Sequence, residues 1–263
     1  MSAPEFFAPS DVDGVVAAMS GGDAVAVAGG TMVVPDMTHG RTRPGRVVDL
    51  SRAGFGAITA DPSGHEVGAM ATYDALAASD LPLLPFVARG ITGGPQIRGR
   101  ATAGGSACYA NPASDVPACL VALGARMRLV SARGEREVPA EEFFVGGFRT
   151  VREPDEVLRA FHVPVSSGTT GYLKFKLAES SWPIVTAAAV AGPDGVRVAI
   201  GGAADRPVVV TADRADVDWR GVVHAALDAA PPWSDVLADA AYRRRIAPVI
   251  AARAVARAVE EES

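Results

Sequence analysis

Apolar residues in the first fifty positions alternate between helical and strand-like spacing. The segment after Pro9 predicts a helix that Ser10 or Asp11 can cap. Its expected buried side consists of Val15, Val16, Ala17 and Met19. The runs 24–28 and 46–50 are short, apolar and valine-rich, so each predicts a strand. The chain therefore opens with alternating helix and strand.

The middle of the chain has hairpin patterns around a helical block. Strands are expected at 55–60 and 65–69, with Asp61 to Gly64 as the turn, and Thr72 can cap a helix that runs to Ala78. Further expected elements are a helix over 83–92, a helix from about 116 to 123, a hairpin over 126–138, a short helical piece from 140, and a strand over 157–163. Ser114 or Asp115 can cap the helix near 116.

A Ser/Gly/Thr-rich linker over 164–170 predicts a boundary. Beyond it, three strands are expected over 172–177, 184–190 and 196–201, and helices over 219–229 and 238–260. The last helix is rich in alanine and arginine, and its arginines are interpreted as a solvated face or, alternatively, a docking surface.

Composition excludes several functions. The chain has 263 residues, 49% hydrophobic and 21% charged, which suits a protein with more than one core. A net charge of −5 and only 6% aromatic residues argue against nucleic-acid binding. No run is long enough to predict a membrane span, and MSAPEFFAPS lacks the basic start and apolar core of a signal peptide, so a cytoplasmic location is expected.

The metal-binding residue types are sparse. Cys108 and Cys119 alone cannot ligate an iron–sulfur cluster, and the four histidines lack ligand spacing. Cys119 is interpreted as a core residue. Cys108 lies beside a glycine pair, where packing is favoured and contact with a cofactor is the alternative.

Two glycine pairs carry the candidate chemistry. Gly29-Gly30 follows the strand 24–28, and Gly104-Gly105 stands between the hydroxyl residues Thr102 and Ser106. Glycine lets the backbone approach a ligand closely, and N–H groups at such turns suit a diphosphate. Each pair alone is more often a plain turn, but two of them could hold one dinucleotide from two sides.

The order and neighbours of these pairs resemble a known family, the FAD-binding subunit or domain of molybdenum hydroxylases of the carbon monoxide dehydrogenase and xanthine dehydrogenase type. Its first motif, close to A-G-G-x-x-x-x-P, is met by Ala28, Gly29, Gly30 and Pro35. Its second, close to Q-[VI]-R-N-x-G-T-I-G-G-N followed by x-P-x-x-D-x-P and A-L-G-A, is met by Gln96, Ile97, Arg98, Thr102, Gly104, Gly105, Pro112, Asp115, Pro117 and residues 122–125. This sequence has Gly99, Ala101, Ala103 and Ser106 where the family usually has Asn, Gly, Ile and Asn.

The resemblance implies a fold and a domain division. The expected class is α+β, with a two-subdomain FAD-binding fold of the vanillyl-alcohol-oxidase or PCMH type over 1–165, divided at about 52. A C-terminal α+β domain with a three-stranded sheet and helices is expected over 170–263.

The resemblance also implies which residues bind FAD, and no metal ligands or catalytic side chains are expected. Val27, Ala28, Gly29, Gly30, Thr31, Met32 and Val33 would wrap the diphosphate; Thr102, Gly104, Gly105 and Ser106 would hold its other side. Asp115 would accept hydrogen bonds from FAD, although a helix cap is the alternative interpretation. Leu158 or a neighbour would pack on the isoalloxazine ring, Lys174 would lie near its pyrimidine edge, and Trp182 would stack near the ring.

The implied function is electron transfer through FAD to an external acceptor. A molybdopterin-binding large subunit and a 2Fe-2S small subunit are the expected partners. The alternatives are a stand-alone FAD-dependent oxidase or oxidoreductase acting directly on a small molecule, and a non-catalytic module that has lost FAD.

Overall fold

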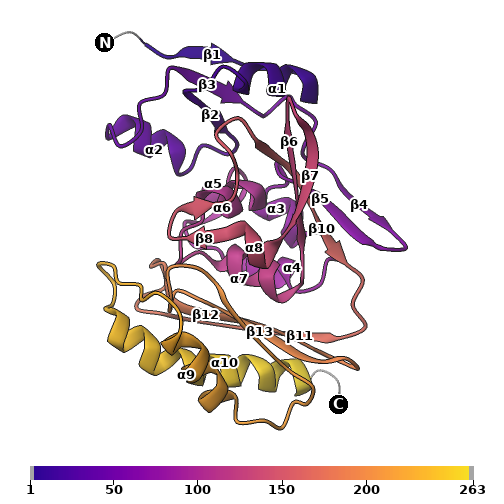
Figure 1. Cartoon of the computed structure of the whole chain (residues 1–263), viewed down its shortest axis with the longest axis vertical. Helices are drawn as coiled ribbons and strands as arrows, with labels where there is room; N and C mark the ends of the chain where they lie inside the picture. The colour runs from indigo at the N-terminus through magenta and orange to yellow at the C-terminus, as the bar shows by residue number, and fades with distance from the viewer. Residues whose placement is uncertain (1–2, 261–263) are drawn as a thin grey trace.

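The computed structural model describes residues 3–260, which form a mixed α/β protein. Three larger sheets follow one another along the long axis of the molecule, from the N-terminal sheet to the C-terminal one (Figure 1). Each of these sheets is built from a continuous stretch of chain, so the order of the units in space follows their order in the sequence.

The N-terminal unit is a parallel sheet with a helix after each of its first two strands. It contains β1 (Glu5–Phe7), α1 (Val12–Met19), β2 (Ala24–Val27), α2 (Val33–Thr38) and β3 (Arg46–Asp49), in the strand order β1-β3-β2. The predicted helix and both predicted strands are confirmed, but the predicted buried side of the helix is wrong at Ala17, which is exposed, whereas Ala18 is buried. Asp11 is the cap of α1, since its carboxylate accepts a hydrogen bond from Gly14 N at 2.8 Å.

The middle unit is an antiparallel five-stranded sheet of order β4-β5-β10-β6-β7. Its strands are β4 (Ile58–Asp61), β5 (Gly64–Gly68), β6 (Arg126–Ser131), β7 (Gly134–Pro139) and β10 (Val157–Pro164). Between β5 and β6 come α3 (Tyr73–Ala77), α4 (Leu84–Arg89), α5 (Pro95–Arg98), α6 (Ala103–Tyr109) and α7 (Asp115–Ala122). After β7 come α8 (Ala140–Phe143) and the small hairpin β8 (Phe144–Gly146) and β9 (Arg149–Thr150).

Both predicted hairpins are confirmed, and Thr72 caps α3.

Two helix predictions in this unit need correction. The helix expected over 83–92 spans only Leu84–Arg89. Gly104-Gly105 is not a turn, because both glycines lie in α6, which Thr102 caps through its hydroxyl. A threonine directly before a helix is a capping signal, and it marks the start of α6 in the sequence.

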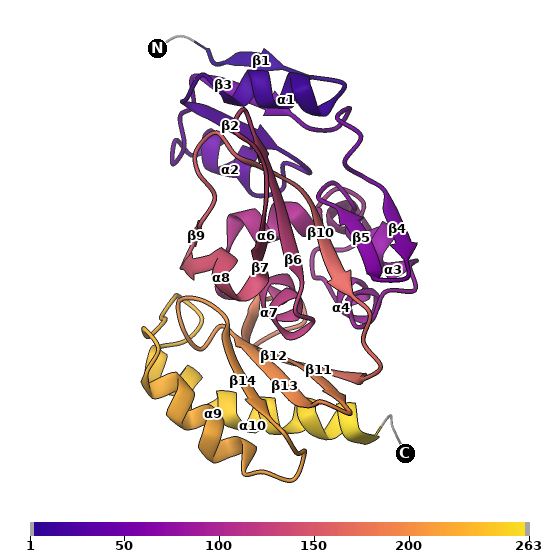
Figure 2. The ribbon, with the colours of Figure 1, turned by 45° about the vertical axis from the view of Figure 1, so that its right-hand side comes forward.

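The C-terminal unit has a four-stranded sheet, which corrects the expected three. Its strands are β11 (Thr169–Lys176), β12 (Pro183–Gly192), β13 (Gly195–Gly201) and β14 (Val208–Ala212), followed by α9 (Trp219–Asp228) and α10 (Ala240–Glu260). β14 is a run of five residues directly after Pro207, and only its antiparallel pairing with β13 makes it a strand. Figure 2 shows α9 and α10 on the outer face of this sheet and α7 on the other.

The expectation that the arginines of the last helix form a solvated face is wrong for Arg243. Its side chain is fully buried and donates to the carbonyl oxygens of Ile184, Gly202 and Ala238 and to the Asp235 carboxylate. A planar guanidinium with five donors can serve several acceptors at once. Arg243 therefore fastens α10 to the ends of β12 and β13.

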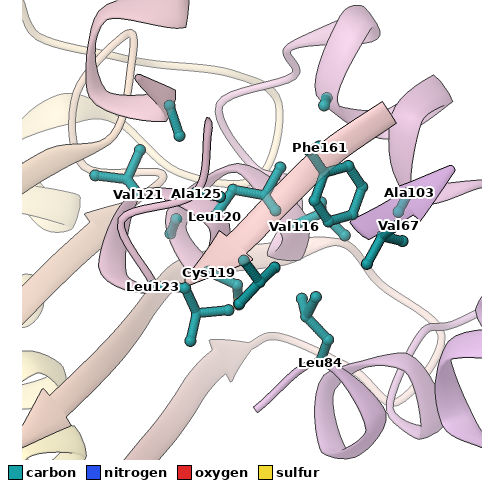
Figure 3. Packing of buried hydrophobic residues seen from close by; sticks show 14 of the residues in the cluster. Val67, Leu84, Ala103, Val116, Cys119, Leu120, Val121, Leu123, Ala125 and Phe161 are labelled. Carbon is teal, nitrogen blue, oxygen red and sulfur yellow. The ribbon is translucent and has the colours of Figure 1, made fainter. Parts of the chain in front are cut away.

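The largest apolar core joins the middle and C-terminal units through α7. Every residue of α7 is buried, including Cys119, which confirms its interpretation as a core residue. Figure 3 shows Val116, Cys119 and Leu120 of this helix in the same apolar cluster as Phe161. Successive side chains of β12 point to opposite faces of the sheet, so Ala188 packs in this core and Ala187 packs in the core under α10.

Candidate functional site

A cavity of about 970 Å³, open mouth included, lies between the N-terminal and middle units. Its walls come from β2 and the segment after it, from α6, and from the start of β10. The predicted residues that line it are Ala28, Gly29, Gly30, Thr31, Met32, Val33, Thr102, Gly104, Gly105, Ser106 and Leu158. The structure thus brings both glycine pairs to one cavity, as the sequence led us to expect.

The first glycine pair forms a turn with unused backbone donors. Gly30 has φ +73°, in the left-handed region, and its carbonyl accepts from Val34 N at 3.2 Å. Within residues 3–260, the N–H groups of Gly29 to Met32 donate to no other protein atom. A Cβ at Gly29 would overlap the carbonyl oxygen of Arg100, so this position needs glycine. Successive free N–H groups at the wall of a cavity can bind an anion.

The second glycine pair serves a different purpose. Its N–H groups are already used, since Gly104 N donates to Ala69 O at 3.2 Å and Gly105 N donates to Thr102 Oγ1 at 3.0 Å. A Cβ at Gly104 would lie 2.5 Å from Cβ of Ala69, and one at Gly105 would lie 2.9 Å from Thr102 Oγ1. The second pair therefore lets α6 pack closely within its own unit.

Two separate groups of hydrogen-bonded polar side chains occur here, one at the cavity wall and one between α7 and β11. Ser106, on the cavity wall, hydrogen-bonds to the hydroxyl of Tyr73. The Asp115 carboxylate accepts from the hydroxyl of Tyr172 and from Lys174 Nζ at 3.1 Å, and Lys174 also donates to Gly90 O at 2.6 Å. Burial raises the pKa of Tyr73 and of Tyr172 well above the usual value, so both remain hydroxyl donors at neutral pH.

Three predicted site residues do not line the cavity. Val27 ends β2, and Asp115 and Lys174 form an ion pair between α7 and β11. Asp115 stands at the first position of α7, with Ser114 at the cap position, and Ser114 makes no capping hydrogen bond. Ser114 thus holds the predicted cap position without the capping hydrogen bond. The cap interpretation of Asp115 is wrong, because its Oδ1 accepts from Tyr172 and Lys174 instead. Trp182 is 40% exposed and does not line the cavity either.

Sequence reasoning missed a cation and a tyrosine at the cavity. Arg152 and Tyr109 both line it, and Arg152 donates to the backbone oxygens of Glu153 and Glu156. Arg152 lies in the loop before β10, where no motif marks it, and Tyr109 ends the helix of the second glycine pair.

The cavity shows no sign of nucleophilic or metal chemistry. Cys108 lines it, so the contact left open for this residue is sterically available, but burial raises the pKa of its thiol and keeps it neutral. No cluster of metal-ligating side chains occurs among residues 3–260. The same residues include no helix long and apolar enough to cross a membrane.

A cavity with free N–H groups, small residues and a cation suits a dinucleotide that carries its own chemistry. Residues 2–166 match the family described as the FAD binding domain in molybdopterin dehydrogenase, and this chain belongs to that family.

Carbon monoxide dehydrogenase relatives match this chain over nearly its whole length, and a xanthine dehydrogenase subunit matches about half of it. The chain is 31% identical to the carbon monoxide dehydrogenase medium chain of Hydrogenophaga pseudoflava, over 95% of each chain. It is 32% identical to the xanthine dehydrogenase FAD-binding subunit of Escherichia coli O157:H7, over 54% of this chain and 50% of that one. A solved structure of carbon monoxide dehydrogenase from Hydrogenophaga pseudoflava superposes with a TM-score of 0.86 at 29% identity, covering 98% of both chains.

Proposed function

We propose that the cavity binds one FAD, with its diphosphate against the free N–H groups of Gly29 to Met32. The observation that carries this proposal is the run of unused N–H donors on the wall of this cavity. Arg152 adds a positive charge to the same cavity, and the Glu156 carboxylate that also lines it is paired with Arg136. The second glycine pair would border the cofactor by shape, and the Ser106 hydroxyl would be its polar contact.

The isoalloxazine ring would lie at the end of the cavity near Leu158, which is the second residue of β10. Leu158 is 2% exposed and lines the cavity, which supports an apolar contact with the ring. Lys174, which pairs with Asp115 outside the cavity lining, would stabilise negative charge on reduced flavin. Trp182 is exposed on the loop after β11 and would approach the ring from the C-terminal unit.

We further propose the fold type and domain division that the motifs implied. A PCMH-type FAD-binding domain over 1–165, divided at about 52, is supported by the separate sheets β1–β3 and β4–β10. A C-terminal domain over 170–263 is supported by the sheet β11–β14 with its own core under α10.

In this account the chain is the FAD-binding subunit of a molybdenum hydroxylase complex. FAD supplies the redox chemistry, and the protein binds, orients and electrostatically adjusts it. Electrons would arrive from a molybdopterin-binding large subunit through a 2Fe-2S small subunit and leave to an external acceptor. Similarity over 95% of a carbon monoxide dehydrogenase medium chain supports a subunit role over a stand-alone oxidase. The free thiols of Cys108 and Cys119 suit the cytoplasm, the compartment that we propose.

The test is an absorption spectrum combined with co-purification. We expect the purified, tagged protein to carry one FAD molecule per chain, or to bind added FAD and retain it through desalting. Expressed with its partners, it should bring down a large and a small subunit. A chain that stays colourless after added FAD is removed would contradict the cofactor, and a flavin-loaded, catalytically competent homo-oligomer would contradict the subunit role.

A further inference from the structure

A hydrogen bond joins the two walls of the cavity and has no part in the proposal above. Tyr109, the last residue of α6, lines the cavity, and its hydroxyl donates to Asp36 Oδ2 on α2 at 3.1 Å. α2 directly follows the first glycine pair, and α6 contains the second. The bond therefore ties together two segments, far apart in sequence, that form opposite sides of the candidate FAD site.

The Asp36 carboxylate is well placed to hold this bond. Its side chain is 14% exposed, and its other oxygen pairs with Arg41 at 3.0 Å. Burial, followed by the negative charge of Asp36, raises the pKa of Tyr109, so the hydroxyl remains a donor at neutral pH.

The ring of Tyr109 is fixed from its other side. It packs edge-on against Phe148 at 5.3 Å between centroids, and Phe148 packs against Trp233 at 5.9 Å. Phe148 has φ +58° and donates its N–H to Ala110 O at 2.8 Å, and Ala110 itself has φ +49°. Two non-glycine residues in the left-handed region persist only where surrounding packing determines the backbone. The hydroxyl is thus presented to Asp36 by a constrained structure.

We propose that Tyr109 and Asp36 form a clasp that retains FAD by resisting separation of the two cavity walls. This inference rests on the proposed function. A cofactor held between two units leaves most easily when they move apart, and a hydrogen bond between the units must break for that motion. Tyr109 acts through Asp36 and is therefore a positioning residue.

The test measures how fast bound FAD is released, from the rise of flavin fluorescence after dilution. Tyr109→Phe keeps the ring and removes the hydroxyl, and we expect release about tenfold faster, the effect of one hydrogen bond to a charged group. Asp36→Ala should act like Tyr109→Phe, and the double variant should be no faster than either single one. Asp36→Asn keeps an acceptor oxygen but not its charge, and should release FAD at a rate between those of the wild type and Asp36→Ala.

Arg41→Ala is the matched control, because it removes the other partner of Asp36 and leaves the Tyr109 bond. We expect this variant to release FAD like the wild type. Equal rates for the wild type and Tyr109→Phe, or a rate for Asp36→Asn as fast as for Asp36→Ala, would overturn the clasp while FAD binding stands. A wild type that binds no FAD would overturn the proposed function itself.

Discussion

Glycine has separate physical roles in the two motifs that define the cavity. At Gly30 the backbone adopts φ +73°, and the turn leaves its N–H groups free. At Gly104 the backbone is helical, and glycine is required by the approach of Ala69. Both pairs are visible in the sequence, but a sequence does not show whether a glycine is present for its dihedral angle or for its missing side chain.

This difference predicts the effect of Gly30→Ala on FAD affinity. A Cβ in the left-handed region costs about 1–2 kcal/mol, so we expect the turn to shift and the FAD dissociation constant to rise about tenfold. Gly54→Ala is the control, because Gly54 has φ +79° with open space around its Cβ position and does not line the cavity. Titration of the flavin-free protein with FAD measures both, and an equal loss of affinity in the two variants would contradict a specific role for Gly30.

Capped helices and turn-bounded strands were largely predictable from the sequence, because their signals are local. Asp11 and Thr72 cap the helices they were expected to cap, and the hairpin around Asp61 is present. β14 and the buried Arg243 could not be predicted in this way. Their state depends on other elements of the C-terminal unit, namely β13 for the strand and the carbonyl oxygens of Ile184 and Gly202 for the arginine.

The candidate site was predictable to the extent that it lies in the two glycine motifs. Leu158 came from the resemblance to a family rather than from any local pattern. Arg152 was missed because a single arginine in a loop resembles any exposed charge, and only the fold turns it toward the cavity.

The role of Arg243 predicts a stability effect at the level of one helix. Arg243→Met would remove the donor to the buried carbonyl oxygens of Ile184 and Gly202 and the ion-pair partner of Asp235, and we expect the free energy of unfolding to fall by about 3–5 kcal/mol. Arg253→Met, at an exposed position of the same helix, should stay within about 0.5 kcal/mol of the wild type. Urea denaturation followed by circular dichroism gives both values, and similar losses for the two variants would be inconsistent with this role.

The ion pair at the start of β10 predicts acid sensitivity of the cavity wall. Hydrogen bonds from Arg136 lower the pKa of Glu156 below its ordinary 4.5, so the stabilisation is present above that pH and is lost as the pH falls through the lowered value. We expect Glu156→Gln to be less stable than the wild type at neutral pH, and the difference to shrink on acidification below pH 4.5.

Unfolding free energies measured across this pH range test the Glu156 prediction. Glu142→Gln, an exposed position on α8, provides a baseline for the loss of one carboxylate. A difference between wild type and Glu156→Gln that stays constant with pH would show that the ion pair is not its source.

At the scale of the whole molecule, the cavity lies between two units that share little besides its walls and a small apolar cluster. That cluster joins Val15 and Met19 of α1 to Val130 and Val157 of the middle unit. The middle unit is joined more extensively to the C-terminal sheet through α7. The N-terminal unit is therefore the one whose movement would open the site, and a ligand held by both walls would restrain it.

Amide hydrogen exchange resolved by residue tests the central claim most directly. Without FAD, the N–H groups of Gly29 to Met32 have no protein acceptor and should exchange fast, whereas Gly105 N–H is bonded to Thr102. The account predicts that FAD slows exchange at Gly29 to Met32 by at least about tenfold and changes Gly105 much less. Unchanged exchange at Gly29 to Met32 with FAD bound would contradict it.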